Sequence, residues 1–534
     1  MSEVKSQASR LNAERPQPSL PASTFILILL VGLFAGARLW RLTAACLWFD
    51  EVFTVHAARY GWAQMLRFVA ADAVHPPLFY ALLKVWTGIG GESLFWLRLL
   101  PAIISIAGIV PFLLLCRELR LGAAETRLAL LLMAVNGYLI KYAQEVRMYS
   151  LLLLLALCSL WLFVRFFRSG GGAKRELVWL TVANLLLVYT HYYGWVVVAV
   201  EAVCLLLWAH TERRWFFISV LVLLVCFSPW AYAVSSAERG QGLAQNIGWV
   251  ARPRLQDFGQ LFTLLNEPFY YRQSSGERPY SRRSLIASLL VFGWPILALF
   301  WHGWRRGREA EAKRHMGQLR WLLCLTLIPL ALAFVLSWLL PQSIWGTRHL
   351  IIMAGPYAML AAVALNRLHP LAAKYALLVL LGCWLFLAAT QTLLRREERH
   401  IWCEWEQLSG QMVERRAAST ERVKVYAFED LVAYHLWFAL KESGGERYRV
   451  SVVKGLEGVL EDRAYFLPRA FDEIAVEDSS AMTEEHIWIA FRAQGWDETR
   501  EPLKTLLERG YKVGNLLTAE ADGQRAFLVE LWRK

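Results

Sequence analysis

Residues 24–51 read TFILILLVGLFAGARLWRLTAACLWFDE, and this stretch indicates the class of fold. It opens with an apolar run long enough to cross a bilayer as an α-helix. It closes on two adjacent carboxylates, Asp50 and Glu51. Carboxylates at a membrane boundary are costly to remove from water, so such a pair indicates a binding partner or a function. No small-residue cleavage site follows the apolar run, and we therefore expect a retained first membrane helix.

Apolar segments of similar length recur along the chain. Its 534 residues are 57% hydrophobic and 13% aromatic, and the mean hydropathy is +0.35. We predict a polytopic α-helical membrane protein with about eleven transmembrane helices. The predicted helices are 24–42, 95–116, 123–140, 149–168, 177–190, 194–210, 215–235, 284–303, 321–341, 350–367 and 375–394.

The charge is unevenly distributed. From residue 400 to the end, 18 Lys and Arg stand against 24 Asp and Glu, a net charge of −6, and the whole chain carries +13. The remainder therefore carries +19, which membrane topology and contact with anionic lipids explain better than nucleic-acid binding. Residues 1–23 are polar and rich in Ser, Pro and Arg, a composition typical of a disordered tail.

Basic residues in the short loops predict the orientation. With the N-terminus in the cytoplasm and an odd number of helices, the C-terminus lies outside, in a multi-pass protein of the plasma (inner) membrane. The loops that are then cytoplasmic hold Arg117, Arg120 and Arg127; Arg165, Arg168, Lys174 and Arg175; Arg213 and Arg214; Arg305, Arg306, Arg308, Lys313 and Arg314; and Arg367 and Lys374.

Two long loops and the C-terminal segment are predicted on the extracytoplasmic side. Loop 43–94 contains helical patterns around 57–70 and 78–88 that suit the membrane interface, and 236–283 forms the second loop. The C-terminal segment, 395–534, has the composition of a soluble domain. Its predicted strands (423–426, 449–453, 487–491, 526–531) and helices (429–442, 500–509) indicate a small α/β domain. We therefore divide the chain into a cytoplasmic tail (1–23), a membrane domain (24–394) and this extracytoplasmic domain.

The eight cysteines do not indicate a disulfide framework. Six of them lie in or beside the apolar segments, where a thiol is a small apolar group. Cys46 and Cys403 fall outside the predicted helices, and we do not expect them to be paired.

Two polar motifs lie in the first long loop. Asp50 and Glu51 are either catalytic carboxylates or partners of nearby arginines at a helix end. Residues 75–78, HPPL, hold a histidine before two prolines that restrict the backbone. His75 is then either part of a rigid turn or an imidazole presented to an anionic substrate or to a carboxylate.

Three further polar motifs lie at outer helix ends. Residues 144–149, QEVRMY, place Glu145 and Tyr149 four positions apart, on one face if the helix has begun there. The alternative is an ion pair of Glu145 with Arg147 or Lys141 that anchors the helix end. Residues 190–194, THYYG, contain His191 and Tyr192, which suit an aromatic belt; a metal role for His191 has little support from spacing.

The last motif is 346–349, GTRH. Arg348 either extends to the lipid headgroups or binds a phosphate in bidentate fashion. All five motifs fall on one side of the membrane, where a helix bundle can gather them around one cavity. A carboxylate there can accept a proton from an acceptor hydroxyl, and cationic groups can stabilise a leaving phosphate.

In this order the motifs resemble those of the membrane-embedded GT-C glycosyltransferases of the protein O-mannosyltransferase and aminoarabinose transferase type. The resemblance covers roughly 24–394 and includes Arg98-Leu99-Leu100-Pro101 at the start of the second helix. It implies a GT-C fold and transfer of a sugar from a polyprenyl-phosphate donor to an acceptor hydroxyl on the extracytoplasmic face, with inversion. The acceptor is a lipid, a glycan or a protein.

The resemblance also implies roles for individual residues. Asp50 would be the general base and Glu51 its neighbour in positioning substrate or metal, with Mg²⁺ or Mn²⁺ left open as a cofactor. The remaining residues divide into those near the donor phosphate (His75, Arg147 and Arg348) and those lining the cavity (Glu145, Tyr149, His191, Tyr192 and His349).

The chain departs from the family pattern at two places. His349 stands where a Tyr is typical after the arginine, and the C-terminal segment does not resemble the β-trefoil domain of eukaryotic protein mannosyltransferases. The alternative function is a transporter or lipid flippase with an outward-facing polar cavity. Transporters often show inverted repeats and a site at the midplane, whereas here the polar motifs lie at the outer ends and no repeat is visible.

Overall fold

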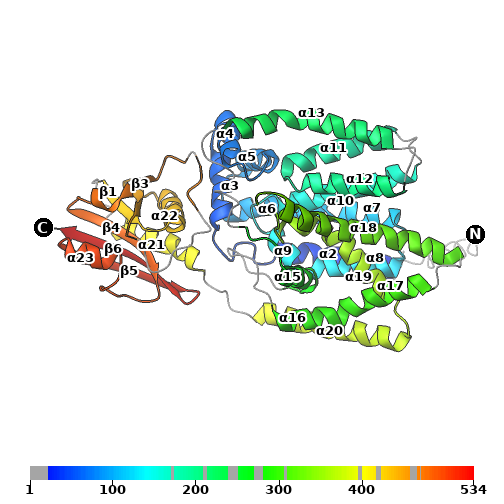
Figure 1. The fold of residues 1–534 in the computed structure, drawn as a ribbon. Helices are drawn as coiled ribbons and strands as arrows, with labels where there is room; N and C mark the ends of the chain where they lie inside the picture. The colour runs from blue at the N-terminus through cyan, green and yellow to red at the C-terminus, as the bar shows by residue number, and fades with distance from the viewer. Residues whose placement is uncertain are drawn as a thin grey trace, which may run out of the picture.

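The computed structural model of the chain describes residues 22–169, 174–208, 213–237, 250–269, 281–305, 310–394, 400–415, 422–456, 466–469 and 471–533. The predicted disordered tail lies outside these residues up to residue 21. A bundle of long helices occupies one part of the molecule, and a sheet domain formed by the end of the chain lies at one end of this bundle (Figure 1).

Each of the eleven predicted transmembrane segments coincides with helix. Within the described residues, seven helical segments are long and apolar enough to cross a membrane, so the count of eleven is not confirmed. The bundle helices are α2 (Ala22–Leu39), α6 (Leu94–Ala107), α7 (Ile109–Glu118), α8 (Ala123–Val135), α9 (Gly137–Ala143), α10 (Tyr149–Arg168), α11 (Lys174–Thr190), α12 (Gly194–Trp208), α13 (Arg213–Ala237), α16 (Arg282–Ser288), η1 (Leu289–Gly293), α17 (Trp294–Arg305), α18 (Ala310–Leu339), η2 (His349–Met353), α19 (Ala354–Asn366) and α20 (Leu371–Leu394).

The first long loop folds into three short helices that lie between the bundle and the sheet domain (Figure 1). They are α3 (Phe49–Arg59), α4 (Trp62–Asp72) and α5 (Leu78–Gly90). The helix predicted around 57–70 is therefore wrong in its bounds, because one helix ends before Tyr60 and the next begins after Gly61. The sequence conceals α3 because residues 51–58 are all buried, which leaves no amphipathic periodicity. A further helix, α15 (Leu255–Asn266), lies in the second long loop.

The C-terminal domain is an α/β domain, as predicted, with one sheet of order β3-β2-β1-β4-β6-β5. Strands β3, β2, β1 and β4 run parallel, and β6 and β5 are added antiparallel. Every predicted strand and helix there has a counterpart, while α21, β3 and β5 were not predicted. The elements are α21 (Ile401–Arg415), β1 (Val423–Ala427), α22 (Asp430–Glu442), β2 (Tyr448–Lys454), β3 (Ala475–Asp478), η3 (Ser479–Ala481), β4 (His486–Ala493), α23 (Leu503–Glu508), β5 (Tyr511–Ala521) and β6 (Gln524–Arg533).

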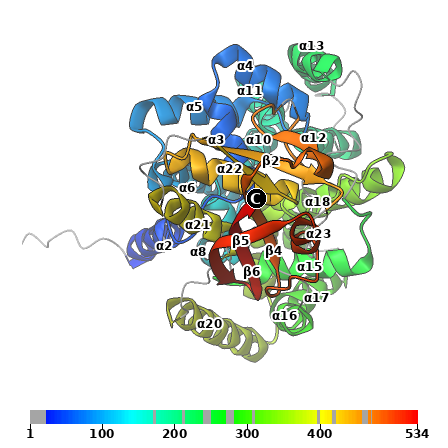
Figure 2. The same cartoon turned by 90° about the vertical axis from the view of Figure 1, so that its left-hand side faces the viewer.

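A disulfide joins the two parts of the molecule. Cys46, just before α3, is bonded to Cys403 at the start of α21. The expectation that these cysteines are unpaired is therefore wrong. The two are 357 residues apart in sequence, and only the docking of the sheet domain beside α3 brings them together. Figure 2 views the molecule from the side of this domain, which lies in front of the bundle.

Candidate functional site

Asp50 lies in the first turn of α3. Its carboxylate pairs with Arg348, which is 298 positions later in the sequence. Its Oδ2 accepts a hydrogen bond from Arg348 Nη1 at 3.1 Å, and both side chains are partly accessible to solvent. Arg147 Nη1 donates to the backbone carbonyl of Asp50 at 3.1 Å and to Thr54 Oγ1 at 2.9 Å. Three separate segments thus hold Asp50 while leaving its carboxylate within reach of solvent.

Glu51 has different surroundings. Its side chain is 1% exposed and forms an ion pair with Arg98, which is equally buried. The Glu51 oxygens also accept from the backbone N–H groups of Trp48 and Val146. Arg98 in turn donates to the carbonyls of Leu42, Ala45 and Cys46. Glu51 therefore ties the loop before α3 to the segment before α10, and both of its oxygens are occupied.

Three histidines from separate motifs lie together near Arg147. The ring centroids of His75 and His191 are 4.9 Å apart, and those of His191 and His349 are 4.6 Å apart. One nitrogen from each ring lies within 4.8 Å of the others, a spacing that could hold a metal ion. The prolines that follow His75 restrict the backbone and hold this corner of the cluster in place.

The hydrogen bonds of these rings suit an anion better than a metal. His191 Nδ1 accepts from the Tyr193 N–H at 3.0 Å, and His75 Nδ1 faces the Nη2 donor of Arg147 at 3.3 Å. Each Nε2 must then carry the proton, whereas a metal-bound histidine normally donates from its other nitrogen. Mg²⁺ and Mn²⁺ also prefer oxygen ligands. Burial lowers the pKa of His75 well below its ordinary value and that of His191 to about 3, so both rings are neutral N–H donors.

Tyr149 contacts this cluster and Glu145 lies near Asp50 and Arg348, although the two side chains do not share one helix face. The helix α10 begins only at Tyr149, so the condition for the predicted shared face is not met. Trp48 Nε1 donates to Glu145 Oε1 at 3.2 Å. Burial raises the pKa of Glu145 to about 7, against the opposing charge of Lys141. The ring of Tyr149 lies 5.9 Å from the Arg348 guanidinium carbon and 6.3 Å from the His349 ring.

Tyr192 is the one predicted cavity residue that we place outside the cluster. Its hydroxyl is contacted by Trp230 Nε1 at 3.4 Å, and its ring centroid lies 6.4 Å from that of Phe227. Both partners belong to α13, on the other side of the turn from His191. Sequence adjacency within the 190–194 motif could not separate these two directions.

Comparisons with known proteins identify the architecture. Residues 74–232, which begin just before His75 and extend beyond His191, match the family model described as dolichyl-phosphate-mannose-protein mannosyltransferase. The crystal structure of ArnT from Cupriavidus metallidurans bound to undecaprenyl phosphate has a TM-score of 0.57 at 15% identity, covering 94% of this chain and 97% of that chain. The chain therefore has the fold of ArnT.

The apo form of the same ArnT gives a similar result. Its TM-score is 0.55 at 15% identity, and the match covers 95% of this chain and 98% of that chain. A search of curated proteins found no sequence match. The family model and the fold therefore confirm the expected resemblance to the GT-C glycosyltransferases.

The sequence patterns did not single out Asp72 as a residue of this site. Asp72 ends α4, three residues before His75. Burial raises its pKa to about 7, and the charge of Arg147 opposes the shift while that of Asp50 adds to it, so the charges of the site act on Asp72. A signal was present in the sequence. An acidic residue at the C-terminal end of a helix is unfavourable for the helix dipole and therefore indicates another purpose.

Several buried polar atoms around the cluster have no hydrogen-bond partner among the residues that the structure describes. Such atoms are rare in folded proteins, and each costs about 1–3 kcal/mol when left unpaired. Their concentration here indicates a polar ligand. They are Glu145 Oε2, Arg147 Nε, Tyr149 Oη, His191 Nε2 and His349 Nδ1.

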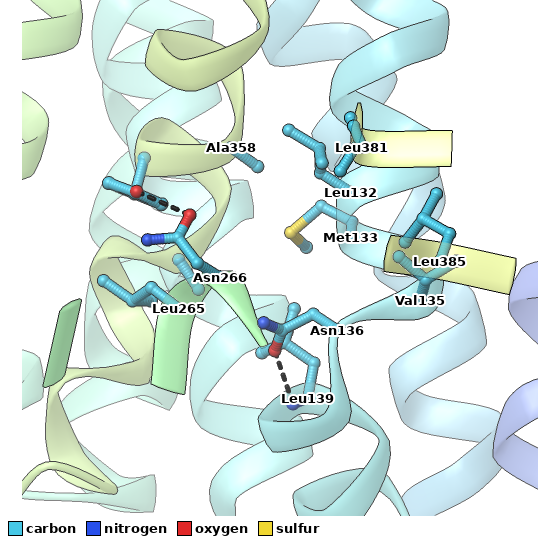
Figure 3. A pocket seen from close by; sticks show the side chains of 12 residues that line it. Leu132, Met133, Val135, Asn136, Leu139, Leu265, Asn266, Ala358, Leu381 and Leu385 are labelled. Atoms are coloured by element: carbon cyan, nitrogen blue, oxygen red, sulfur yellow. Dashed lines mark hydrogen bonds between the residues drawn. The ribbon is translucent and has the colours of Figure 1, made fainter. Parts of the chain in front are cut away.

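A separate small cavity lies between α8, α15, α19 and α20 (Figure 3). Only about 20 Å³ of it admits a water-sized sphere. Tyr357 Oη donates to Asn266 Oδ1 at 2.7 Å, and Asn136 Oδ1 accepts from the Leu139 N–H at 2.9 Å. These polar groups are satisfied, and the space holds little more than one water molecule. We therefore do not consider it a candidate site.

Proposed function

We propose that the chain transfers a sugar from a polyprenyl-phosphate-linked donor to an acceptor hydroxyl on the extracytoplasmic side of the membrane, with inversion. The observation that carries the proposal is the contact between Asp50 and Arg348, beside three neutral histidines. It sets a proton acceptor next to groups that suit a phosphate. The GT-C fold supports the proposal, and the similar ArnT structure is described as bound to undecaprenyl phosphate.

Asp50 is the general base in this proposal. As the acceptor oxygen forms its bond to the sugar C1, its proton passes to the Asp50 carboxylate. The bond from C1 to the phosphate oxygen breaks, and the polyprenyl phosphate leaves with the electron pair. Arg348, Arg147 and His75 face that phosphate and stabilise its charge. Attack opposite the leaving group inverts the anomeric centre.

Glu51 is a positioning residue in this scheme. Because its oxygens already accept from Arg98 and from two backbone N–H groups, it holds the loop that presents Asp50 rather than touching substrate. The cavity residues are Glu145, Tyr149, His191 and His349. Their unpartnered buried atoms are available to form hydrogen bonds with a polar ligand. The acceptor is a lipid, a glycan or a protein.

The orientation belongs to the same proposal. The N-terminus is cytoplasmic and the C-terminal domain extracytoplasmic, in the plasma (inner) membrane. The basic short loops favour this arrangement. The disulfide between Cys46 and Cys403 supports it independently, because disulfides persist on the oxidising side of the membrane. We keep the division into a tail (1–23), a membrane domain (24–394) and a soluble domain (395–534).

The substitution Asp50→Asn tests the function. Full-length protein in detergent is supplied with labelled polyprenyl-phosphate sugar and the cell-envelope fraction of a deletion strain, and label bound covalently to envelope components is counted. We expect wild-type transfer and at least a hundredfold loss in Asp50→Asn, since general base catalysis contributes about 10²–10⁴-fold. The matched control is Asp497→Asn, on an exposed turn of the soluble domain.

Full activity of Asp50→Asn would remove this residue as the base. Movement of the donor lipid across vesicle membranes, with no covalent transfer of label, would instead favour the flippase alternative.

A further inference from the structure

The C-terminal domain docks on the helix that carries Asp50. Helix α22 lies between the sheet and the bundle (Figure 1), and it contacts α3. The contacts extend from one end of α3 to the other: the rings of Phe49 and Tyr434 at 5.2 Å, those of His56 and Trp437 at 5.0 Å, and the ion pair of Arg59 and Glu442 at 2.6 Å. The domain thus packs along the whole length of the helix that carries Asp50.

Tyr434 has a feature that docking alone does not explain. Its side chain is 0% exposed, and within the described part of the chain its hydroxyl has no hydrogen-bond partner. The ring is held between Trp437, stacked at 5.7 Å, and Phe471, edge-on at 5.3 Å. A phenylalanine would make the same apolar contacts without burying an unpaired hydroxyl, which is unfavourable. The buried, unpaired hydroxyl therefore indicates that a ligand binds here.

Electrostatic interactions link Tyr434 to Asp50 through Asp72. Burial raises the pKa of Tyr434 well above its ordinary value, and the nearby Tyr60 and Asp72 add to the shift. Asp72 in turn interacts with Asp50 and Arg147. The polar cluster of the membrane domain therefore continues through Asp72 to the soluble domain.

The soluble domain also delivers a cation to this place. The charge of Arg469 acts on Asp72. The segment that carries Arg469 is anchored on both sides: the Leu467 N–H donates to Asp430 Oδ2 at 3.2 Å, and the Phe471 ring lies 5.2 Å from that of His56. Arg469 is thus held between α22 and α3, at the edge of the site.

We propose that Tyr434, Asp72 and Arg469 bind the acceptor, and that this acceptor presents a neutral, hydroxyl-bearing group such as a sugar ring. The inference rests on the proposed function. An inverting displacement requires the acceptor to approach opposite the leaving phosphate, and the phosphate side is already occupied by the histidines and Arg348. One carboxylate and one guanidinium balance in charge, and together with a phenol they offer both donors and acceptors to hydroxyl groups.

The substitution Tyr434→Phe tests the proposal because it removes only the hydroxyl. Transfer is measured with full-length protein while the amount of envelope fraction from the deletion strain and the amount of polyprenyl-phosphate sugar are varied in turn. We expect the half-saturating amount of envelope acceptor to rise about three- to tenfold, the effect of one lost hydrogen bond. The half-saturating donor concentration stays unchanged.

The matched control is Tyr426→Phe, which removes a buried hydroxyl that donates to Glu484 at 2.8 Å inside the sheet domain. We expect this control to melt at a lower temperature and to keep wild-type saturation by acceptor. Unchanged acceptor saturation in Tyr434→Phe would overturn the inference, as would an equal loss for donor and acceptor accompanied by a lower melting temperature. If the wild-type protein transfers no sugar at all, the proposed function fails and the acceptor site with it.

Discussion

Replacing Glu51 with Gln removes one charge from the most buried ion pair of the site while preserving its shape. The side chains of Glu51 and Arg98 are each 1% exposed, and the carboxylate oxygens receive hydrogen bonds from Arg98 at 3.1 and 3.3 Å. The two backbone donors, Trp48 and Val146, add bonds of 3.1 and 2.9 Å. A Gln amide keeps one acceptor oxygen and directs an NH₂ group at donors that cannot accept.

The expected loss of stability follows from these contacts. Removing one partner of a buried ion pair typically costs about 3–5 kcal/mol, because the other charge stays buried without compensation. Native proteins are stable by only about 5–15 kcal/mol, so the change is large. It also loosens the loop that presents Asp50, and we therefore expect Glu51→Gln to lower both the melting temperature and the rate of transfer.

Thermal melting of the full-length protein in detergent measures the effect, and the double-mutant cycle with Arg98→Met isolates the pair. We expect a coupling free energy of about 2–4 kcal/mol, since the double variant leaves no uncompensated charge. The matched control is Glu520→Gln in the exposed pair with Arg525, for which we expect less than about 1 kcal/mol.

A Glu51→Gln variant that melts within a degree of wild type and keeps full activity would refute this reasoning. So would strictly additive effects in the cycle, which would mean that Glu51 and Arg98 do not act as a pair.

Three further predictions concern donor binding, pH dependence and the disulfide. Arg348→Ala should weaken donor binding about tenfold or more, the worth of a hydrogen bond to a charged group, with partial recovery in Arg348→Lys; unchanged donor saturation would contradict the phosphate role. Because the folded-state pKa of Glu145 is raised to about 7, the folded protein holds a proton that the unfolded chain loses above its ordinary pKa. Stability should therefore fall as the pH rises from about 5 to about 7, Asp72 should contribute with the same sign, and Glu145→Gln should flatten the melting curve against pH; an unaltered slope would count against it. Cys403→Ser should lower the melting temperature and abolish its sensitivity to reductant, since removing a native disulfide often costs about 2–5 kcal/mol; equal sensitivity in wild type and variant would speak against the link.

Local features were predictable wherever a short window carries the physical signal. The length of an apolar run compared with the bilayer thickness was enough to predict the membrane class. Short apolar runs with β-branched or aromatic residues were enough to predict β1, β2, β4 and β6. Strand β5 is interrupted, because its pairing with β6 shifts register between Val513 and Leu516, and that strand was missed. Helix α3 was missed because it is buried along most of its length.

The sequence by itself determined that this is a membrane protein whose acidic, histidine and arginine motifs lie at helix ends, because both signals depend on neighbouring residues. Only the tertiary structure decided which motif residues meet. It joined Asp50 to Arg348 across 298 positions, occupied both oxygens of Glu51, and turned Tyr192 towards α13. It also linked Cys46 to Cys403 and placed Tyr434 and Asp72 beside the site. Such contacts depend on how distant helices pack, and the packing is set by the sum of many weak contacts that no local pattern records.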